Sequence, residues 1–133
     1  MIGAVLVLIC GGGALAVAVF ATRVAPSVSR AVNAADGIRT GARAFLDPLV
    51  AGEPSKAFKA TCAEVQTNYT ADDLTDIVAD RWPATYKITS VQATGTDKGI
   101  ASATISFRSG ETYSHDYPLL NENGTWRVCG DPI

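Results

Sequence analysis

Hydrophobic residues dominate the start of the chain. From Ile2 to Thr22 the sequence IGAVLVLICGGGALAVAVFAT contains no charged residue. A helix rises about 1.5 Å per residue, so this segment would cross the roughly 30 Å core of a bilayer. A cleaved signal peptide is the alternative, with Val19-Phe20-Ala21 as its cleavage site. However, no basic residue precedes the segment, and signal peptides have shorter apolar runs of about 7–15 residues. We expect residues 1–22 to be a retained transmembrane anchor.

Polar and apolar positions alternate with helical spacing after the anchor. Pro26 marks a break or a helix start, so we expect a juxtamembrane linker or helix at residues 23–35 and a folded domain at residues 36–133. The domain begins with apolar residues at steps of three and four, which predict one face of an amphipathic helix. These residues are Ile38, Ala42, Phe45, Leu46, Leu49 and Val50. Asp47-Pro48 predicts a bend near the end of this helix.

Two more helices are predicted before the sequence pattern changes to one typical of strands. One begins near Glu53-Pro54-Ser55, with proline in the first turn and an inward face that contains Phe58, Cys62 and Val65. A shorter helix begins at Thr70, a residue suited to capping, and Asp72 and Asp73 complement the positive end of its dipole. Its expected inward residues are Leu74, Ile77 and Val78.

β-Branched and alternating residues predict strands from Tyr86 onward. Turn signals separate four segments, at residues 86–94, 100–108, 111–120 and 125–130. Asn123-Gly124 is the strongest of these signals, because both central positions of a type I′ turn need positive φ. Short turns predict an antiparallel four-stranded meander, with a bulge where alternation fails at Ser90-Val91. Helices followed by such a sheet define an α+β fold in which the helices cover one face of the sheet.

Three cysteines bear on the location of the domain. Cys10 lies in the expected anchor, which leaves Cys62 on a helix and Cys129 on the last strand. On an oxidising side of the membrane we predict that these two form a disulfide. Strict alternation along the last strand places Cys129 on the other face of the sheet from Trp126 and Val128. Three arrangements therefore stay open: the apolar pair faces the core and Cys129 passes around the sheet edge, the pair lies on the far face, or a bulge ends the strand.

Charge excludes one class of partner and complicates the topology. Residues 1–52 carry four arginines and two aspartates, whereas residues 53–133 carry a net charge of −4. An acidic domain lacks the basic surface that phosphate backbones require, so we expect no nucleic-acid binding. The arginines after the anchor favour a cytoplasmic domain, whereas the cysteines favour an extracytoplasmic one. We expect the extracytoplasmic location, in a cell membrane with a single span.

Catalytic and metal-binding patterns are weak. Ser114-His115-Asp116 contains the residue types of a catalytic triad, but neighbours on a strand point to opposite faces and cannot converge. One histidine and two distant cysteines do not match a zinc site, and the acids Asp72, Asp76 and Asp80 form a solvated helix stripe. We expect no catalytic residues, no metal and no cofactor. The aromatic residues and the histidine that a pocket or docking surface would use are Tyr69, Tyr86, Tyr113, His115, Tyr117 and Trp126.

The order of these features resembles a known family. The anchor is followed by FLDPLVAGEPSKAFKATC, then YTADDL, a hydrophobic meander and a closing GTWRVCG. This order resembles actinobacterial single-pass membrane proteins with a lumazine-binding-like domain of unknown function, within the nuclear-transport-factor-2-like, cystatin-like superfamily. The resemblance covers about residues 36–131. It implies a curved sheet with helices packed on its concave side as a cone, and an extracytoplasmic domain; the fold alone implies no activity.

These observations favour a binding function over catalysis. We expect a membrane-anchored binding or scaffold module that serves as an accessory to a transport or secretion complex of the cell envelope. The first alternative is a carrier that holds a small apolar ligand or lipid in the cone. The second is an isomerase- or dehydratase-like enzyme that uses the cone pocket, which the resemblance allows but no motif supports.

Overall fold

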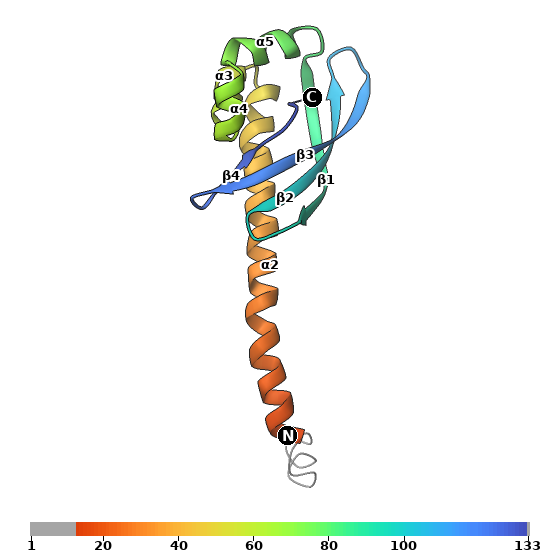
Figure 1. Ribbon diagram of the computed structural model, residues 1–133. Coiled ribbons are helices and arrows are strands. Elements are labelled where there is room, and N and C mark those ends of the chain that lie inside the picture. The colour runs from red at the N-terminus through yellow and green to blue at the C-terminus, as the bar shows by residue number, and fades with distance from the viewer. Residues whose placement is uncertain (1–12, 133) are drawn as a thin grey trace. The chain divides into compact units, whose positions relative to one another are not determined.

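The computed structural model describes residues 13–132, and their side chains from residue 30 onward. The chain divides into two compact units, Met1–Asn33 and Ala34–Ile133. The helices, in chain order, are α2 (Gly13–Val50), α3 (Pro54–Lys59), α4 (Ala63–Asn68) and α5 (Ala71–Ala79). The strands are β1 (Pro83–Ala93), β2 (Lys98–Phe107), β3 (Thr112–Glu122) and β4 (Thr125–Val128) (Figure 1).

The expected anchor is only partly within the described residues. Residues 1–12 of the segment lie outside them. Within residues 13–132, none of the helices combines the length and the apolar character that a membrane span requires. Pro26 stands inside α2, which continues through residues 23–35 without ending there.

The sheet confirms the predicted meander. Its strand order is β1-β2-β3-β4, and every neighbouring pair is antiparallel. The predicted irregularity in β1 is confirmed by a register shift between Ile88 and Ser90. The turn between β3 and β4 has positive φ at both central residues, 53° at Asn123 and 87° at Gly124. The α+β class, with helices on one face of a curved antiparallel sheet, therefore follows from the local signals of the sequence.

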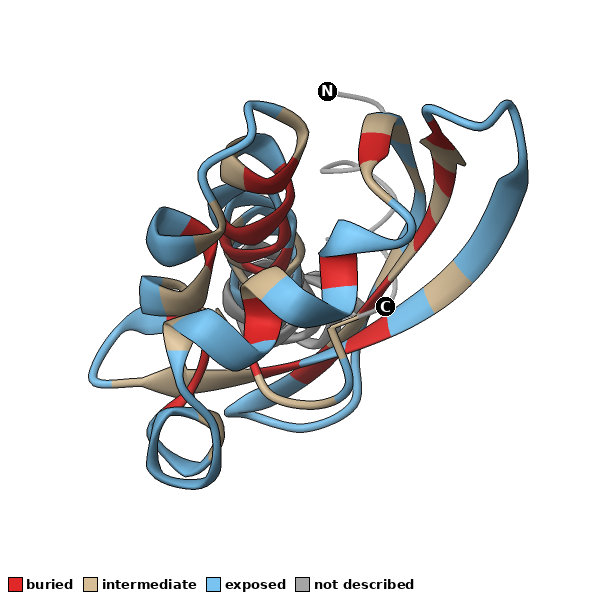
Figure 2. Cartoon of the chain, turned by 90° about the horizontal axis from the view of Figure 1, so that it is seen from above, coloured by how far each residue is buried: buried red, intermediate tan, exposed pale blue. Residues whose placement is uncertain are grey.

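The core lies between the sheet and residues 34–50 of α2. Figure 2 shows the sheet curving around the helices, with buried positions on the sides that face each other. Alternate residues of β2, from Ala101 to Phe107, are buried as their spacing predicts. On α2 the buried apolar residues are Ile38, Ala42, Phe45, Leu46 and Leu49.

Two glycines bring α2 very close to β4. A Cβ atom placed on Gly37 would lie 2.5 Å from the indole Nε1 of Trp126, and one on Gly41 would lie 2.5 Å from the Trp126 carbonyl oxygen. Trp126 is 8% exposed and Val128 is fully buried. The apolar pair of the last strand therefore faces the core, which is the first of the three arrangements left open by the sequence.

The second predicted helix is wrong in its extent. It is interrupted at residues 60–62, which separate α3 from α4. There the chain pairs with β4: the Val128 N–H donates to the Ala60 carbonyl at 3.0 Å, and the Cys62 N–H donates to the Val128 carbonyl at 2.8 Å. These bonds replace two that would have continued the helix. Cys62 is consequently the N-cap of α4 and not part of a helix face.

We expect Gly41→Ala to destabilise the domain despite the higher helix propensity of alanine. The propensity gain of about 1 kcal/mol is smaller than the overpacking cost of about 1–3 kcal/mol, because the added methyl group meets backbone that cannot rotate away. Urea unfolding followed by tryptophan fluorescence measures the change. Gly95→Ala is the control, since its Cβ would meet no atom closer than 4.0 Å. Equal stability of the two variants would show that α2 can move away from β4 at little cost.

Candidate functional site

An open groove of about 570 Å³ lies between α4, α5 and the C-terminal segment of the described domain. Its apolar lining comes from three helices and from β3. The lining residues used below are Phe58, Val65, Tyr69, Leu74, Ile77 and Pro118. We refer to this feature as the α4–α5 groove.

The start of α5 is held by a complete capping box. The Thr70 hydroxyl accepts a hydrogen bond from the Asp73 N–H at 3.2 Å, and the Asp73 carboxylate accepts one from the Thr70 N–H at 2.7 Å. The hydrogen bond from the Thr70 side chain, followed by the one from its backbone, lowers the pKa of Asp73 from the ordinary 3.8. The box thereby satisfies the N–H of Asp73, which has no partner within the helix, and the N–H of Thr70.

Two large apolar side chains of the groove stay in contact with solvent. Leu74 and Val78 anchor α5 in the core, as predicted, but Ile77 is 44% exposed and was wrongly expected to point inward. Tyr69 is 52% exposed. Both line the same groove, and large apolar side chains exposed at a concave surface are typical of interaction sites.

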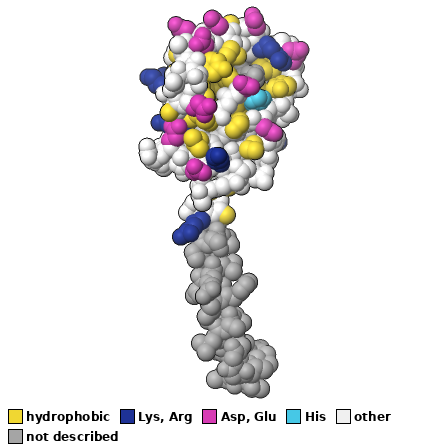
Figure 3. Space-filling view, in the orientation of Figure 1, with side chains coloured by type: hydrophobic (Ala, Val, Ile, Leu, Met, Phe, Trp, Pro, Cys, Tyr) yellow, Lys and Arg dark blue, Asp and Glu magenta, His cyan; other side chains and the backbone are white. Residues whose placement is uncertain are grey.

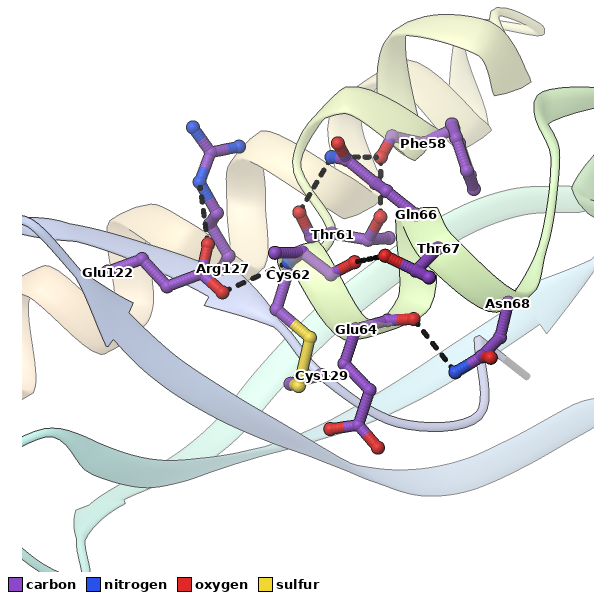
Figure 4. The surroundings of a disulfide bond; sticks show 11 residues. Phe58, Thr61, Cys62, Glu64, Gln66, Thr67, Asn68, Glu122, Arg127 and Cys129 are labelled. Atoms are coloured by element: carbon purple, nitrogen blue, oxygen red, sulfur yellow. Dashed lines mark hydrogen bonds and ion pairs between the residues drawn. A yellow bond between two sulfur atoms is a disulfide. The ribbon is translucent and has the colours of Figure 1, made fainter.

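A disulfide closes the opposite wall of the groove. Cys62 and Cys129 are bonded, with their Cα atoms 5.1 Å apart, as predicted (Figure 4). The strand β4 ends at Val128, and the Cys129 N–H then donates to the Pro118 carbonyl at 2.8 Å. This bond continues the register that pairs Val128 with Leu119. Residues 129–132, which line the groove, are held in place by this bond.

His115 supports the same wall. Its Nε2 donates a hydrogen bond to the Asp131 carbonyl at 3.0 Å, and its ring packs edge-on against Tyr117 at 4.6 Å between centroids. The neighbouring residues face the other way: Asp116 accepts a hydrogen bond from Ser102 at 2.6 Å, and Ser114 lies 3.4 Å from Thr104. The three residues of the Ser-His-Asp sequence therefore do not converge.

A polar network behind the disulfide joins α3 and α4 to β4. Glu122 accepts a hydrogen bond from the Ala63 N–H at 3.0 Å and lies 3.6 Å from the Arg127 guanidinium. Arg127 also donates to the Lys59 carbonyl at 2.6 Å, and Gln66 donates to the Thr61 carbonyl at 2.9 Å. Figure 4 shows the contacts of Glu122 and Gln66 around the cysteines, and the network keeps α4 in position beside the groove.

The groove is acidic and has no basic lining residue. Glu64 and Asp131 are part of its lining, which contains no lysine, arginine or histidine. Asp72, Asp76 and Asp80 are exposed along α5. Figure 3 shows hydrophobic side chains gathered on this face of the domain, with both acidic and basic side chains among them.

The aromatic residues singled out in the sequence do not form one pocket. Tyr117 and Trp126 are buried in the core, and burial, with a smaller contribution from Tyr113, raises the pKa of Tyr117. The Tyr86 hydroxyl donates to Asp47 on α2, and burial followed by this contact raises the pKa of Tyr86. Tyr113 is exposed outside the groove. Only Tyr69 of this set lines the groove, while His115 acts on it through Asp131.

The sequence patterns did not identify most of the groove residues as a site, although one helix-start pattern pointed to two of them. Tyr69 and Leu74 flank the cap at the positions of a hydrophobic staple, where the residue before the cap packs near the fourth residue of the helix. Both line the groove. Among the described residues, no group of three or more histidine, cysteine, aspartate or glutamate side chains is placed to hold a metal ion.

Comparison with known proteins shows a similarity of fold only. No family description matches the sequence, and no curated protein is similar to it. A SEC-C motif-containing protein from Rhodopseudomonas palustris has a similar structure, with a TM-score of 0.54 and 13% sequence identity over 64% of this chain and 69% of that chain. A Campylobacter jejuni protein described as an NTF2-like transpeptidase gives a TM-score of 0.48 and 17% identity over 68% of this chain and 94% of that chain.

Loss of the disulfide is expected to destabilise the domain and loosen the groove wall. The double variant Cys62→Ser/Cys129→Ser should lose about 4 kcal/mol of unfolding free energy, the chain-entropy value for a loop closed across 67 positions. Urea unfolding measures the loss, and hydrogen exchange should rise at residues 129–132. A reducing agent should have the same effect on the wild type and none on the double variant. Unchanged stability would mean that the polar network alone holds the wall.

The capping box predicts an acid-sensitive start of α5. Because the folded-state pKa of Asp73 is lowered, its carboxylate stabilises the helix start above about pH 4, and this contribution is lost as the pH falls through the folded-state pKa. A carboxyl ¹³C NMR titration should place the pKa of Asp73 below 3.8, and Thr70→Ala should raise it. Thr75→Ala is the control, because that hydroxyl bonds only Ala71. An Asp73 pKa that Thr70→Ala leaves unchanged would contradict the box.

Proposed function

We propose that this protein is a non-catalytic binding module that holds a partner in the α4–α5 groove. The observation that carries the proposal is the pairing of Tyr69 with Ile77, both about half exposed, at an apolar concave surface. Tyrosine is enriched among the residues that dominate binding energy at interfaces, and exposed apolar patches mark interaction sites. The partner would belong to a transport or secretion complex of the cell envelope.

The filled interior of the domain supports a surface site over a cone pocket. Tyr117, Phe45 and Ile105 occupy the space between α2 and the sheet and are fully buried. The single histidine bonds to a backbone carbonyl and has no acid or nucleophile from its own strand beside it. These contacts favour binding over an isomerase- or dehydratase-like reaction.

The superfamily and the location belong to the same proposal. Helices packed on the concave side of a four-stranded meander are the architecture expected of the nuclear-transport-factor-2-like, cystatin-like superfamily, and we assign the domain to it. A disulfide between cysteines of a small domain supports an oxidising, extracytoplasmic location. Residues 1–22 would then anchor the protein in the cell membrane by a single span.

A carrier function is the second candidate. The groove volume of about 570 Å³ falls within the range of roughly 300–1,000 Å³ typical of small-molecule sites. A lipid tail or another apolar ligand would occupy the surface formed by Phe58, Val65 and Leu74.

Site-specific photocrosslinking in intact membranes tests the leading proposal. A photoreactive amino acid at position 77 or 69 should give one defined protein adduct, and the same residue at position 113, which is exposed but outside the groove, should not. Ile77→Asp should reduce recovery of that partner more than tenfold, the loss expected for a central interface residue. A lipid adduct in place of a protein adduct would favour the carrier, and adducts independent of position would refute the groove as the site.

A further inference from the structure

We infer that the α4–α5 groove accepts an extended polypeptide segment that places an apolar side chain in the cavity and lysine or arginine residues on either side of it. This inference rests on the proposed binding function and names the chemistry of the partner. It follows from the arrangement of acidic and apolar residues around the groove.

The acidic residues at the groove lack partners of opposite charge within the described domain. None of its ion pairs involves Glu64 or Asp131 of the lining, nor the three exposed aspartates of α5. The nearest cation in sequence, Arg81, is engaged elsewhere: its guanidinium lies 4.5 Å from the Phe107 ring centroid and 3.7 Å from Glu111. The negative potential of this face is therefore available to a basic ligand.

Helix geometry places the acids next to the exposed apolar residue. Asp73 precedes Ile77 by four residues and Asp80 follows it by three, so both neighbour it on the helix surface. Asp72, Asp76 and Asp80 continue along the solvent side of the same helix. Ile77 thus lies on the border between an apolar surface and a row of carboxylates.

The length of this row favours a polypeptide over a small cation. From Asp72 to Asp80 the helix rises about 12 Å. Alternate residues of an extended chain lie on one side about 7 Å apart, so two basic side chains of one segment can meet carboxylates at separate turns of α5. A ligand with a single ammonium group would neutralise the carboxylate of one helical turn only. Tyr69 adds a rigid aromatic side chain at the rim, which suits contact with a peptide backbone or an aliphatic side chain.

Peptide binding to the full-length protein in nanodiscs tests this inference. The probe is a fluorescent, acetylated octapeptide with leucines at its centre and lysines on both sides, and the matched probe carries glutamates in place of the lysines. Fluorescence anisotropy should show at least tenfold tighter binding of the lysine peptide, weakened by added salt because exposed charges are screened. Equal binding of the two peptides, or no binding of the lysine peptide, would overturn the inference.

Two pairs of variants separate charge and apolar contributions. The double variant Asp76→Asn/Asp80→Asn should weaken the binding of the lysine peptide by about threefold to tenfold, as expected for the loss of two exposed ion pairs. The matched control is Asp36→Asn/Asp97→Asn, which removes the same charge from exposed positions on α2 and on the turn between β1 and β2, away from the α5 row. Ile77→Ser should weaken the binding of both peptides, whereas Tyr113→Ser should leave the binding of both unchanged. Equal effects of the test and control pairs would mean that only net charge matters and would refute a specific site.

The photocrosslinked partner distinguishes failure of this inference from failure of the binding function. A crosslink from position 77 to a segment with flanking lysines or arginines supports both. A crosslink to an acidic or uncharged segment overturns the inference and leaves the binding module intact. A lipid adduct at position 77 overturns both.

Discussion

The close contact between Trp126 of β4 and the two glycines of α2 sets the spacing of the whole domain. Any side chain larger than hydrogen at Gly41 would meet the backbone of Trp126, so helix and strand can approach only because these positions carry none. The short approach puts Leu119 and Val128 in the same core as Ile38. It also places the edge of β4 where residues 60–62 can pair with it.

This pairing links the core to the groove. Backbone bonds to Val128 end α3, begin α4 and set Cys62 within bonding distance of Cys129. The disulfide and His115 then hold the C-terminal segment as one wall of the groove, and the capped α5 forms the other. A surface for binding is thus built from segments far apart in sequence, each fixed by a short-range contact to its neighbour.

The helix α5 has an apolar face and an acidic face, and the groove contains residues of both kinds for this reason. Leu74 and Val78 attach the helix to the core, whereas its aspartates require water or a cation. Ile77 lies between these two faces and is covered by neither. With Tyr69 and the apolar groove lining, Ile77 forms an exposed apolar surface of the kind that marks interaction sites, and a partner with both apolar and basic groups would match this surface and the carboxylates.

Local patterns in the sequence were enough to determine the element types, the order of the meander, the bulge in β1, the type of the β3–β4 turn, the Thr70 cap and the pairing of Cys62 with Cys129. Each depends on spacing, turn conformation or the count of cysteines, which are properties of neighbouring residues or of composition. The tertiary structure alone decided that Thr61 would leave the helix for β4, that Trp126 would face the core, and that Ile77 would stay exposed at a groove. Those outcomes depend on which distant backbone groups and side chains compete for the same space and hydrogen bonds, and no periodicity along the chain records that competition.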